Sequence, residues 1–307
     1  MKFEIVVATS LLCLALFTVS PISRSSHKML DAQSFLLSLY RPEIGLCVEY
    51  EGSNSVWITH DNLLAGYAME QWNRTIADNI TSTVKHLAVE YDLVCNSENV
   101  PIDTRAEILL GYNVHALNET GVRIVDPSYH GYALRNEEAT NKAFEDWMNY
   151  ADLVIYQALT ELKKQDYTYA DQLYDMAKQF WDGKGFNDKA ARLHGYYDVY
   201  KLGLFYYLNR IMGKGHFEFE EVLVERTWSC QASNGGFLTE YYGNGSIPDG
   251  TKANCETTAI ILLANMPETV AETYEDGDWW QDPKTLVITV EAAIIIALAV
   301  KCVFRRR

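Results

Sequence analysis

Two glycine-rich loops decide the fold prediction: DGKGF at residues 182–186 and NGGF at residues 234–237. Looser versions occur upstream, EGSN at residues 51–54 and ETG at residues 119–121. The loops are separated by roughly 50 to 70 residues, which is the length of two antiparallel helices and their connection. We therefore expect helical hairpins that repeat along the chain and pack as a ring, with the loops reversing the chain at one end.

Apolar residues recur at helical spacing between these loops. The positions i, i+3, i+4 and i+7 of an amphipathic helix are apolar in several segments. These segments are residues 65–72, 155–162, 173–180 and 259–266. Strand-like alternation is confined to a short stretch at residues 45–50. The pattern predicts an all-α domain with at most a small hairpin.

Both ends of the chain have the composition of membrane-targeting segments. An apolar run near the N-terminus has the length of an export signal. Near the C-terminus, an apolar stretch long enough to span a bilayer is followed by three arginines, which favour a cytoplasmic tail. We expect a single-pass protein of the cell membrane with an extracellular main domain. The expected parts are a signal peptide (1–25), the main domain (26–266), an acidic stalk (267–285), a transmembrane helix (286–304) and a basic tail (305–307).

The charge balance argues against a nucleic-acid partner. The chain has 41 acidic and 26 basic residues, giving a formal net charge of −15. Binding to a polyanion depends on basic side chains that neutralise phosphates, and no basic stripe precedes the C-terminal arginines. The expected partners are a glycan or another component of the cell envelope, and the membrane.

Cysteines outside the two apolar ends are even in number, which suits disulfides in an exported domain. We expect two local bridges, Cys47 with Cys95 and Cys230 with Cys255. Zinc ligation is the alternative, but no CxxC pair or histidine-rich cluster favours it, so we expect no metal and no cofactor.

Four Asn-x-Ser/Thr sequons occur in the expected extracellular domain, and in that setting they predict exposed glycosylation positions. They begin at Asn73, Asn79, Asn118 and Asn244.

One loop and the segment that follows it resemble a known superfamily. Residues 231–237 (QASNGGF) followed by residues 254–259 (NCETTA), with a similar WDGKGF at residues 181–186, resemble the loop-then-helix signature of α/α-toroid proteins. That superfamily includes six-hairpin glycosidases, polysaccharide lyases and terpenoid cyclases, and the chain is also similar to archaeal membrane-anchored surface proteins of this build. The resemblance implies an (α/α) toroid over most of the exported part. The aspartate motifs DxDD and DDxxD of terpenoid cyclases are missing, so the carbohydrate branch is favoured.

Cleavage of a glycosidic bond needs two carboxyl groups across a cleft, one to protonate the leaving oxygen and one to attack or to activate water. We select carboxylates where a glycine-rich loop meets a helix. The candidates are Asp61, Asp182, Asp188, Glu240 and Glu256. Four of these have a structural alternative, since Asp61 suits an N-cap, Glu256 suits a helix dipole, and Asp182 and Asp188 suit turns.

Aromatic residues beside the same loops could stack on a sugar ring, and a histidine adjoins Asp61. The candidate ligand-binding residues are Trp57, His60, Trp181, Tyr241 and Tyr242. Core packing is the alternative for the aromatic residues, and a structural role is the alternative for a single histidine.

The sequence therefore leads to two hypotheses of different classes. In the first, a six-hairpin glycosidase-like domain binds a glycan and hydrolyses or modifies it. In the second, the same fold is a non-catalytic scaffold or binding module of the cell envelope.

Overall fold

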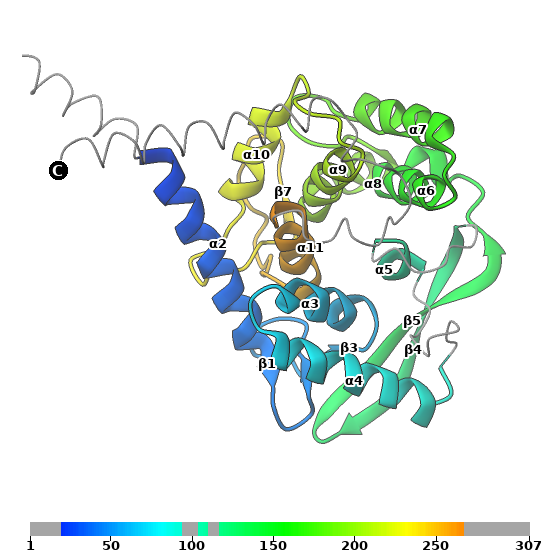
Figure 1. Cartoon of the computed structure of the whole chain (residues 1–307), viewed down its shortest axis with the longest axis vertical. Coiled ribbons are helices and arrows are strands. Elements are labelled where there is room, and N and C mark those ends of the chain that lie inside the picture. The colour runs from blue at the N-terminus through cyan, green and yellow to red at the C-terminus, as the bar shows by residue number, and fades with distance from the viewer. Residues whose placement is uncertain (1–19, 94–103, 110–116, 267–307) are drawn as a thin grey trace, which may run out of the picture. The chain divides into compact units, whose positions relative to one another are not determined.

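The computed structural model describes residues 20–93, 104–109 and 117–266 (Figure 1). All of these belong to the first of two units of the chain, Met1–Met266. The second unit, Pro267–Arg307, lies outside the described residues.

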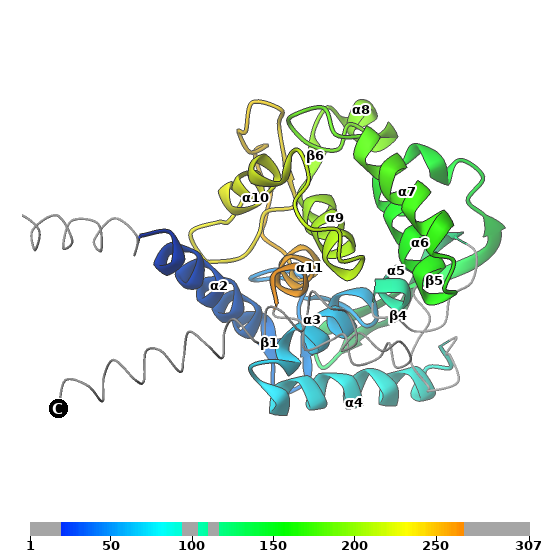
Figure 2. The ribbon, with the colours of Figure 1, turned by 45° about the horizontal axis from the view of Figure 1, so that its top comes forward.

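Helices make up most of the described chain. They are α2 (Ser20–Leu39), α3 (His60–Glu70), α4 (Arg74–Glu90), α5 (Thr104–Leu109), α6 (Ala151–Lys163), α7 (Tyr167–Gln179), α8 (Lys189–His194), α9 (Val199–Ile211), α10 (Glu220–Ser229) and α11 (Cys255–Asn265), with a 3-10 turn η1 (Trp147–Asn149). Helix α3 packs against α4, and α6 packs against α7. Helix α11 lies between α3 and α9 in both views (Figures 1 and 2). Nearly all of α11 is buried, as its almost continuous apolar sequence requires.

The four segments with helical spacing are found in α3, α6, α7 and α11, so those element predictions are confirmed. Side chains cap several helices by accepting a hydrogen bond from the first turn, as Asn73 does for α4 and Asn254 for α11.

Within the described residues, strands form three small sheets. They are β1 (Tyr40–Arg41), β2 (Leu46–Cys47), β3 (Ser55–Trp57), β4 (Asn118–Tyr129), β5 (Tyr132–Ala143), β6 (Tyr197–Asp198) and β7 (Glu240–Tyr241). β1 pairs with β2, β6 pairs with β7, and the third sheet has the order β3-β5-β4. Within it β3 runs parallel to β5, while β4 and β5 form a long antiparallel hairpin. His130 and Gly131 turn this hairpin with φ angles of 49° and 89°, as a two-residue turn with a left-handed backbone requires.

The prediction of an all-α toroid is wrong. Of the described residues, 52% are helical and 18% are in strands, so the fold is mixed α/β. The difference comes mainly from the β4–β5 hairpin, whose residues 119–121 we interpreted as a loop between helices. Both faces of β4 are largely exposed or half-buried, and its pairing is interrupted by bulges, so no clean alternation marks it in the sequence.

The structure contains both predicted glycine-rich loops, and the two loops have a similar form. Each is closed by an isolated antiparallel bridge, Trp181 with Phe186 and Gln231 with Phe237, and each ends on a buried phenylalanine. Glycine is required at Gly235, where φ is +91° and an added Cβ would lie 2.3 Å from the carbonyl oxygen of Asp31 on α2.

The prediction of a single-pass membrane protein is wrong for the helices that the structure describes. Within residues 20–93, 104–109 and 117–266, no helix combines the length and the apolar character needed to cross a bilayer. Even the 20-residue helix α2 carries His27, Lys28 and Asp31. It also begins at Ser20, before the expected end of the signal peptide. The predicted stalk (267–285), transmembrane helix (286–304) and tail (305–307) lie outside the described residues.

The expected disulfide between Cys230 and Cys255 is also wrong, because both are free, buried thiols, as is Cys47. Cys95 lies outside the described residues. The thiol that neighbours Cys255 is that of Cys47, and a hydrogen bond between them raises the pKa of Cys255 well above its ordinary value. The prediction favours cysteine pairs that close short loops, whereas the fold brings β2 against the start of α11.

Candidate functional site

His60 and Asp61 begin helix α3 at the point where strand β3 ends. The buried side chain of Asn62 fixes this junction, because it accepts a hydrogen bond from the Cys47 backbone N–H (2.7 Å) and donates to the carbonyl of Trp57 (2.7 Å). Thr59 occupies the N-cap position, and its hydroxyl donates to Asn136 on β5 instead of capping the helix. Asp61 is therefore a first-turn residue and not the N-cap that we considered.

Glu256 lies in the first turn of α11, which is anchored near α3 by its own backbone and side chains. Asn254 caps α11 by accepting from the N–H of Thr257 (2.9 Å), and the N–H of Cys255 donates to the carbonyl of Glu49 (2.8 Å). The Cys255 thiol lies 3.7 Å from the backbone oxygen of Asp61. Two helix starts that are far apart in the sequence are thus held side by side.

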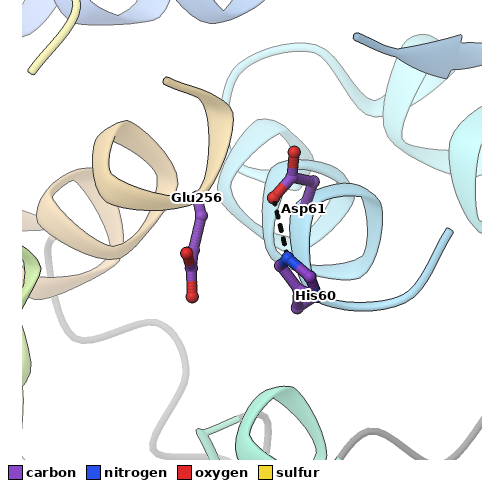
Figure 3. Close-up of side chains that lie close together, drawn as sticks. All are labelled: His60, Asp61 and Glu256. Carbon is purple, nitrogen blue, oxygen red and sulfur yellow. Dashed lines mark ion pairs between the residues drawn. The ribbon is translucent and has the colours of Figure 1, made fainter. Parts of the chain in front are cut away.

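These starts bring three of the predicted residues together: His60, Asp61 and Glu256, which we call the His60 cluster (Figure 3). One nitrogen or oxygen of each lies within 4.8 Å of the others. Nε2 of His60 is 3.4 Å from Oδ1 of Asp61. Asp61 is 1% exposed and His60 is 8% exposed, whereas Glu256 is only partly buried. Solvent therefore reaches the cluster from the side of Glu256.

A further carboxylate faces the other nitrogen of His60. Oε2 of Glu137, on β5, is 3.6 Å from Nδ1 of His60 and also pairs with Arg105 on α5. Thr120 on β4 donates to the second oxygen of Glu137. The predicted residue Trp57 packs on the imidazole, with ring centroids 4.8 Å apart. His60 is consequently flanked by one carboxylate at each ring nitrogen.

The carboxylates of the His60 cluster act electrostatically on the neighbouring thiol of Cys255. The hydrogen bond with Cys47 and burial are the main causes of its raised pKa, and the charges of Cys47, Asp61 and Glu256 add to them. The charges of the cluster that act on Cys255 are therefore negative.

A cavity of about 180 Å³ adjoins Glu137; we call it the Arg105 pocket. Its lining includes Arg105, Thr120, Phe144, Tyr150, Asp152 and Leu153. Figure 2 shows the elements that form it, α5, α6 and the β4–β5 hairpin, next to one another. Two larger hollows lie elsewhere: one of about 290 Å³ between α3 and α4, and one of about 300 Å³ between α4 and the loop that joins β1 to β2. Neither is lined by a residue of the His60 cluster.

A buried lysine gathers three aspartates beside this pocket; we call Lys201, Asp152, Asp188 and Asp198 the Lys201 network. Nζ of Lys201 is 2.7 Å from Asp188, 2.7 Å from Asp198 and 3.9 Å from Asp152. Burial opposes the charge on Lys201, but the three carboxylates outweigh it and raise the pKa of Lys201 above its ordinary value. Burial raises the pKa of Asp198.

The predicted catalytic residue Asp188 has a structural position in this network. It is fully buried, and it accepts hydrogen bonds (3.0 Å each) from the backbone N–H of Ala151, the first residue of α6, and from that of Ala191 in the first turn of α8, which it caps.

The remaining predicted residues lie around the two glycine-rich loops, and no contact described here joins them to the His60 cluster. Asp182 holds its turn by accepting from Lys184 and Gly185, and Glu240 accepts from Thr251. The other positions are aromatic. Trp181 stacks on Phe219 at 4.5 Å, Tyr241 is buried and donates to the Lys184 carbonyl, and Tyr242 is 42% exposed.

The sequon asparagines serve varied local roles. Asn73 caps α4, Asn79 donates to Tyr40, Asn244 accepts from Ser246 in a turn, and Asn118 lines the Arg105 pocket. No sequence criterion selected Arg105, Glu137 or Asp152. Asp152 stands at a helix start, so a search of first turns would have found it, but Glu137 lies on a strand that we did not predict.

Comparisons with known proteins do not assign a function to this site. No family model, no curated protein and no solved structure matches the chain. The resemblance to α/α-toroid proteins therefore gains no support from them.

Proposed function

We propose that this chain is a divalent-metal-dependent enzyme that acts on a glycan at the His60 cluster. The observation that carries the proposal is the convergence of an imidazole and two carboxylates, from helices at opposite ends of the described chain, within 4.8 Å of one another.

The donor set and its spacing suit a divalent transition metal such as zinc or manganese. Imidazole and carboxylate are ligands of these ions, at bond lengths of about 2.0–2.2 Å. Two ligands at such distances are about 3.4 Å apart in a tetrahedral site, and Nε2 of His60 and Oδ1 of Asp61 already have a separation of 3.4 Å. Glu256 is partly exposed, so rotation of its flexible side chain can close the remaining gap.

The carboxylate behind the imidazole supports the same interpretation. Metal-binding histidines commonly donate their other ring N–H to a carboxylate, which fixes the tautomer and the ring orientation. Glu137 lies on this side of the ring, with Oε2 at 3.6 Å from Nδ1, which is an ion-pair distance and longer than a hydrogen bond, and Arg105 and Thr120 orient it. Glu137 therefore acts as a positioning residue for His60.

A divalent ion at this place would lower the pKa of bound water and polarise a bond to be cleaved. Glu256 is partly exposed, so this side of the site is open to water, and an open position distinguishes a catalytic from a structural metal site. The glycan is favoured by the Arg105 pocket, which combines hydrogen-bonding and aromatic side chains and adjoins the cluster through Glu137.

Metal binding can be tested directly on chelator-treated protein by calorimetry with zinc and with manganese. We expect one site per chain, and free metal at a hundred times its Kd should stabilise the fold by about 2.7 kcal/mol. His60→Ala, Asp61→Asn and Glu256→Gln should each abolish that gain. His86→Ala is the matched control, because His86 pairs with one carboxylate, Glu90, at 3.5 Å on the exposed face of α4.

Activity is tested by incubating metal-loaded and metal-free protein with a panel of polysaccharides. Cleavage that requires metal and is lost in Asp61→Asn supports the proposal. Cleavage that survives chelation would instead make Asp61 and Glu256 a direct carboxyl pair. Absence of both metal binding and cleavage would leave the non-catalytic scaffold as the function.

A further inference from the structure

We propose that the outer edge of strand β4 pairs with the same edge of a second copy of this chain and so forms a twofold-symmetric dimer. The inference concerns assembly and does not rest on the proposed function.

The outer edge of β4 carries no strand within the described part of the chain. The sheet has the order β3-β5-β4, so β5 occupies one edge of β4 and no described strand occupies the other. Residues 121–124 of β4 are all exposed, and the side chains of Val122 and Ile124 are 60% and 63% exposed. An exposed edge strand with apolar side chains is a template for pairing with another chain. The groups on which the inference depends therefore lie at the surface.

The regular part of β4 is short. Its register with β5 is continuous from Thr120 to Ile124, and the register shifts on both sides of this segment. Between Asn118 and Thr120 the extra residues belong to β5, so β4 itself stays extended there. Between Ile124 and Asp126 the extra residue belongs to β4, and such a bulge bends the strand. A partner strand can therefore follow β4 over residues 118–124.

Charge favours a second copy as the partner and selects one register. In a twofold antiparallel pair, residues at equal distances from the central residue lie opposite each other. With Gly121 at the centre, Arg123 lies opposite Glu119 of the partner subunit, and this pair occurs twice. Among the centres from Thr120 to Ile124, Gly121 alone places Arg123 opposite an acidic residue. A centre at Arg123 would place two arginines opposite each other, which is destabilising.

Both charged side chains are accessible to a partner. The side chains of Arg123 and Glu119 are 42% and 39% exposed. Within the chain, Arg123 pairs with Glu138 and Glu119 pairs with Lys142. Ion pairs at such exposed positions contribute little to folding. A second copy can therefore share these side chains at little cost to the fold.

The other face of the strand would gain apolar contacts in the same register. Val122 lies opposite Thr120 of the partner subunit, so the valines of the two copies become diagonal neighbours. Pairing thus removes part of their exposed apolar surface from water. At the twofold axis, Gly121 places no side chain between the two strands.

The size and symmetry of the contact predict a weak, closed dimer. Pairing over residues 118–124 buries less than the roughly 800 Å² per partner of a standard interface, so we expect a Kd of about 10–100 µM. Both copies contribute the same edge, so association stops at two chains.

Sedimentation equilibrium of the full chain tests the dimer. Val122→Lys introduces a charge of the kind that protects natural edge strands, and it should weaken dimerisation at least about tenfold. Val89→Lys is the matched control, because Val89 is 70% exposed on α4, and it should leave the Kd unchanged. A chain that stays monomeric at concentrations about tenfold above the expected Kd range would overturn the inference. So would a dimer that is equally tight in Val122→Lys, since it would use another surface.

Charge exchange tests the register. Arg123→Glu and Glu119→Arg should each weaken the dimer about tenfold, because each places like charges opposite each other twice. An equimolar mixture of the two single variants should recover dimerisation, since both pairs in the mixed dimer are again of opposite charge. Circular dichroism verifies that each variant is folded. Single variants that dimerise as the wild type does, or a mixture that stays monomeric, would refute the proposed pairing.

Cross-linking locates the axis independently of charge. An added Cβ at Gly121 meets one described atom within 4 Å, Cγ2 of Thr140 at 3.8 Å, so Gly121→Cys should fold. Under the thiol oxidant diamide, this variant should form a covalent dimer that the wild type does not form. Ser128→Cys, exposed on β4 outside the paired segment, is the control. Cross-linking of Ser128→Cys in preference to Gly121→Cys would contradict the inference.

Discussion

Replacing Lys201 by methionine should destabilise the protein by about 3–5 kcal/mol at pH 7, because it removes the positive charge of a buried ion-pair network. Lys201 is 2% exposed and lies within 4 Å of three aspartates. Methionine keeps much of the volume of the side chain, so the loss comes from uncompensated carboxylates and not from a cavity. Against a typical free energy of unfolding of about 5–15 kcal/mol, this is a large fraction.

The loss should shrink as the pH falls. A carboxyl group whose pKa is raised by folding contributes stability that is present below its unfolded pKa and is lost as the pH rises through the folded value. Burial already raises the pKa of Asp198, and without Lys201 nothing in the network opposes that rise. The variant should therefore be least affected near pH 4 and most affected at neutral pH.

Urea unfolding followed by circular dichroism measures the effect at several pH values. Lys178→Met is the matched control: Lys178 also contacts two carboxylates, Asp175 and Glu218, but both are exposed, so about 1 kcal/mol or less should be lost. Adding Asp188→Asn to Lys201→Met should recover part of the stability. If Lys201→Met lost no more than Lys178→Met, the network would be hydrated, and Asp152 would not be held as described.

Three further predictions concern local features. Burial raises the pKa of Cys230 from 9.0 to about 11, which corresponds to about 3 kcal/mol of stability lost between pH 9 and 11; Cys230→Ala should flatten the unfolding free energy over that range. Cys47, Cys230 and Cys255 are buried free thiols, so a thiol reagent should modify them only after unfolding, and rapid modification of the native chain at these positions would contradict the packing. Gly235→Ala should cost about 1–3 kcal/mol and more than Gly183→Ala, which has a similar φ (+88°) but nothing within 4 Å of the new Cβ; equal costs would mean that contact with α2 is unimportant.

The elements that could be predicted from the sequence are helices that bury one face, because such burial requires apolar residues at helical spacing. Helices α6 and α7 each bury one side, so apolar residues recur at helical spacing in both. The β4–β5 hairpin has no such constraint, because much of it is exposed on both faces and its register shifts at bulges. Its turn residues, His130 and Gly131, were the available signal, although His-Gly is less typical of such turns than Asn-Gly.

The candidate site could be predicted only in part for a related reason. His60, Asp61 and Glu256 stand beside loops and helix starts, where local sequence marks a carboxylate. Glu137 reaches His60 only because β5 pairs in parallel with β3, across a separation of about 80 residues that no local pattern encodes. The neighbouring thiols Cys47 and Cys255 were missed for the same reason.

Electrostatic energies distinguish the His60 cluster from a single carboxylate at a helix start. A helix dipole stabilises a first-turn carboxylate by about 0.3–1 kcal/mol, which suffices to explain Asp61 or Glu256 taken singly. Two carboxylates within 4.8 Å repel each other by about 3.5 kcal/mol at an effective dielectric constant of 20, more than both dipoles return. A shared proton or a positive charge must offset this repulsion, and His60 is placed to provide positive charge, as imidazolium or by holding a metal ion. Since an unperturbed imidazole is largely neutral above pH 7, metal binding that persists at pH 8 would assign this charge to the ion.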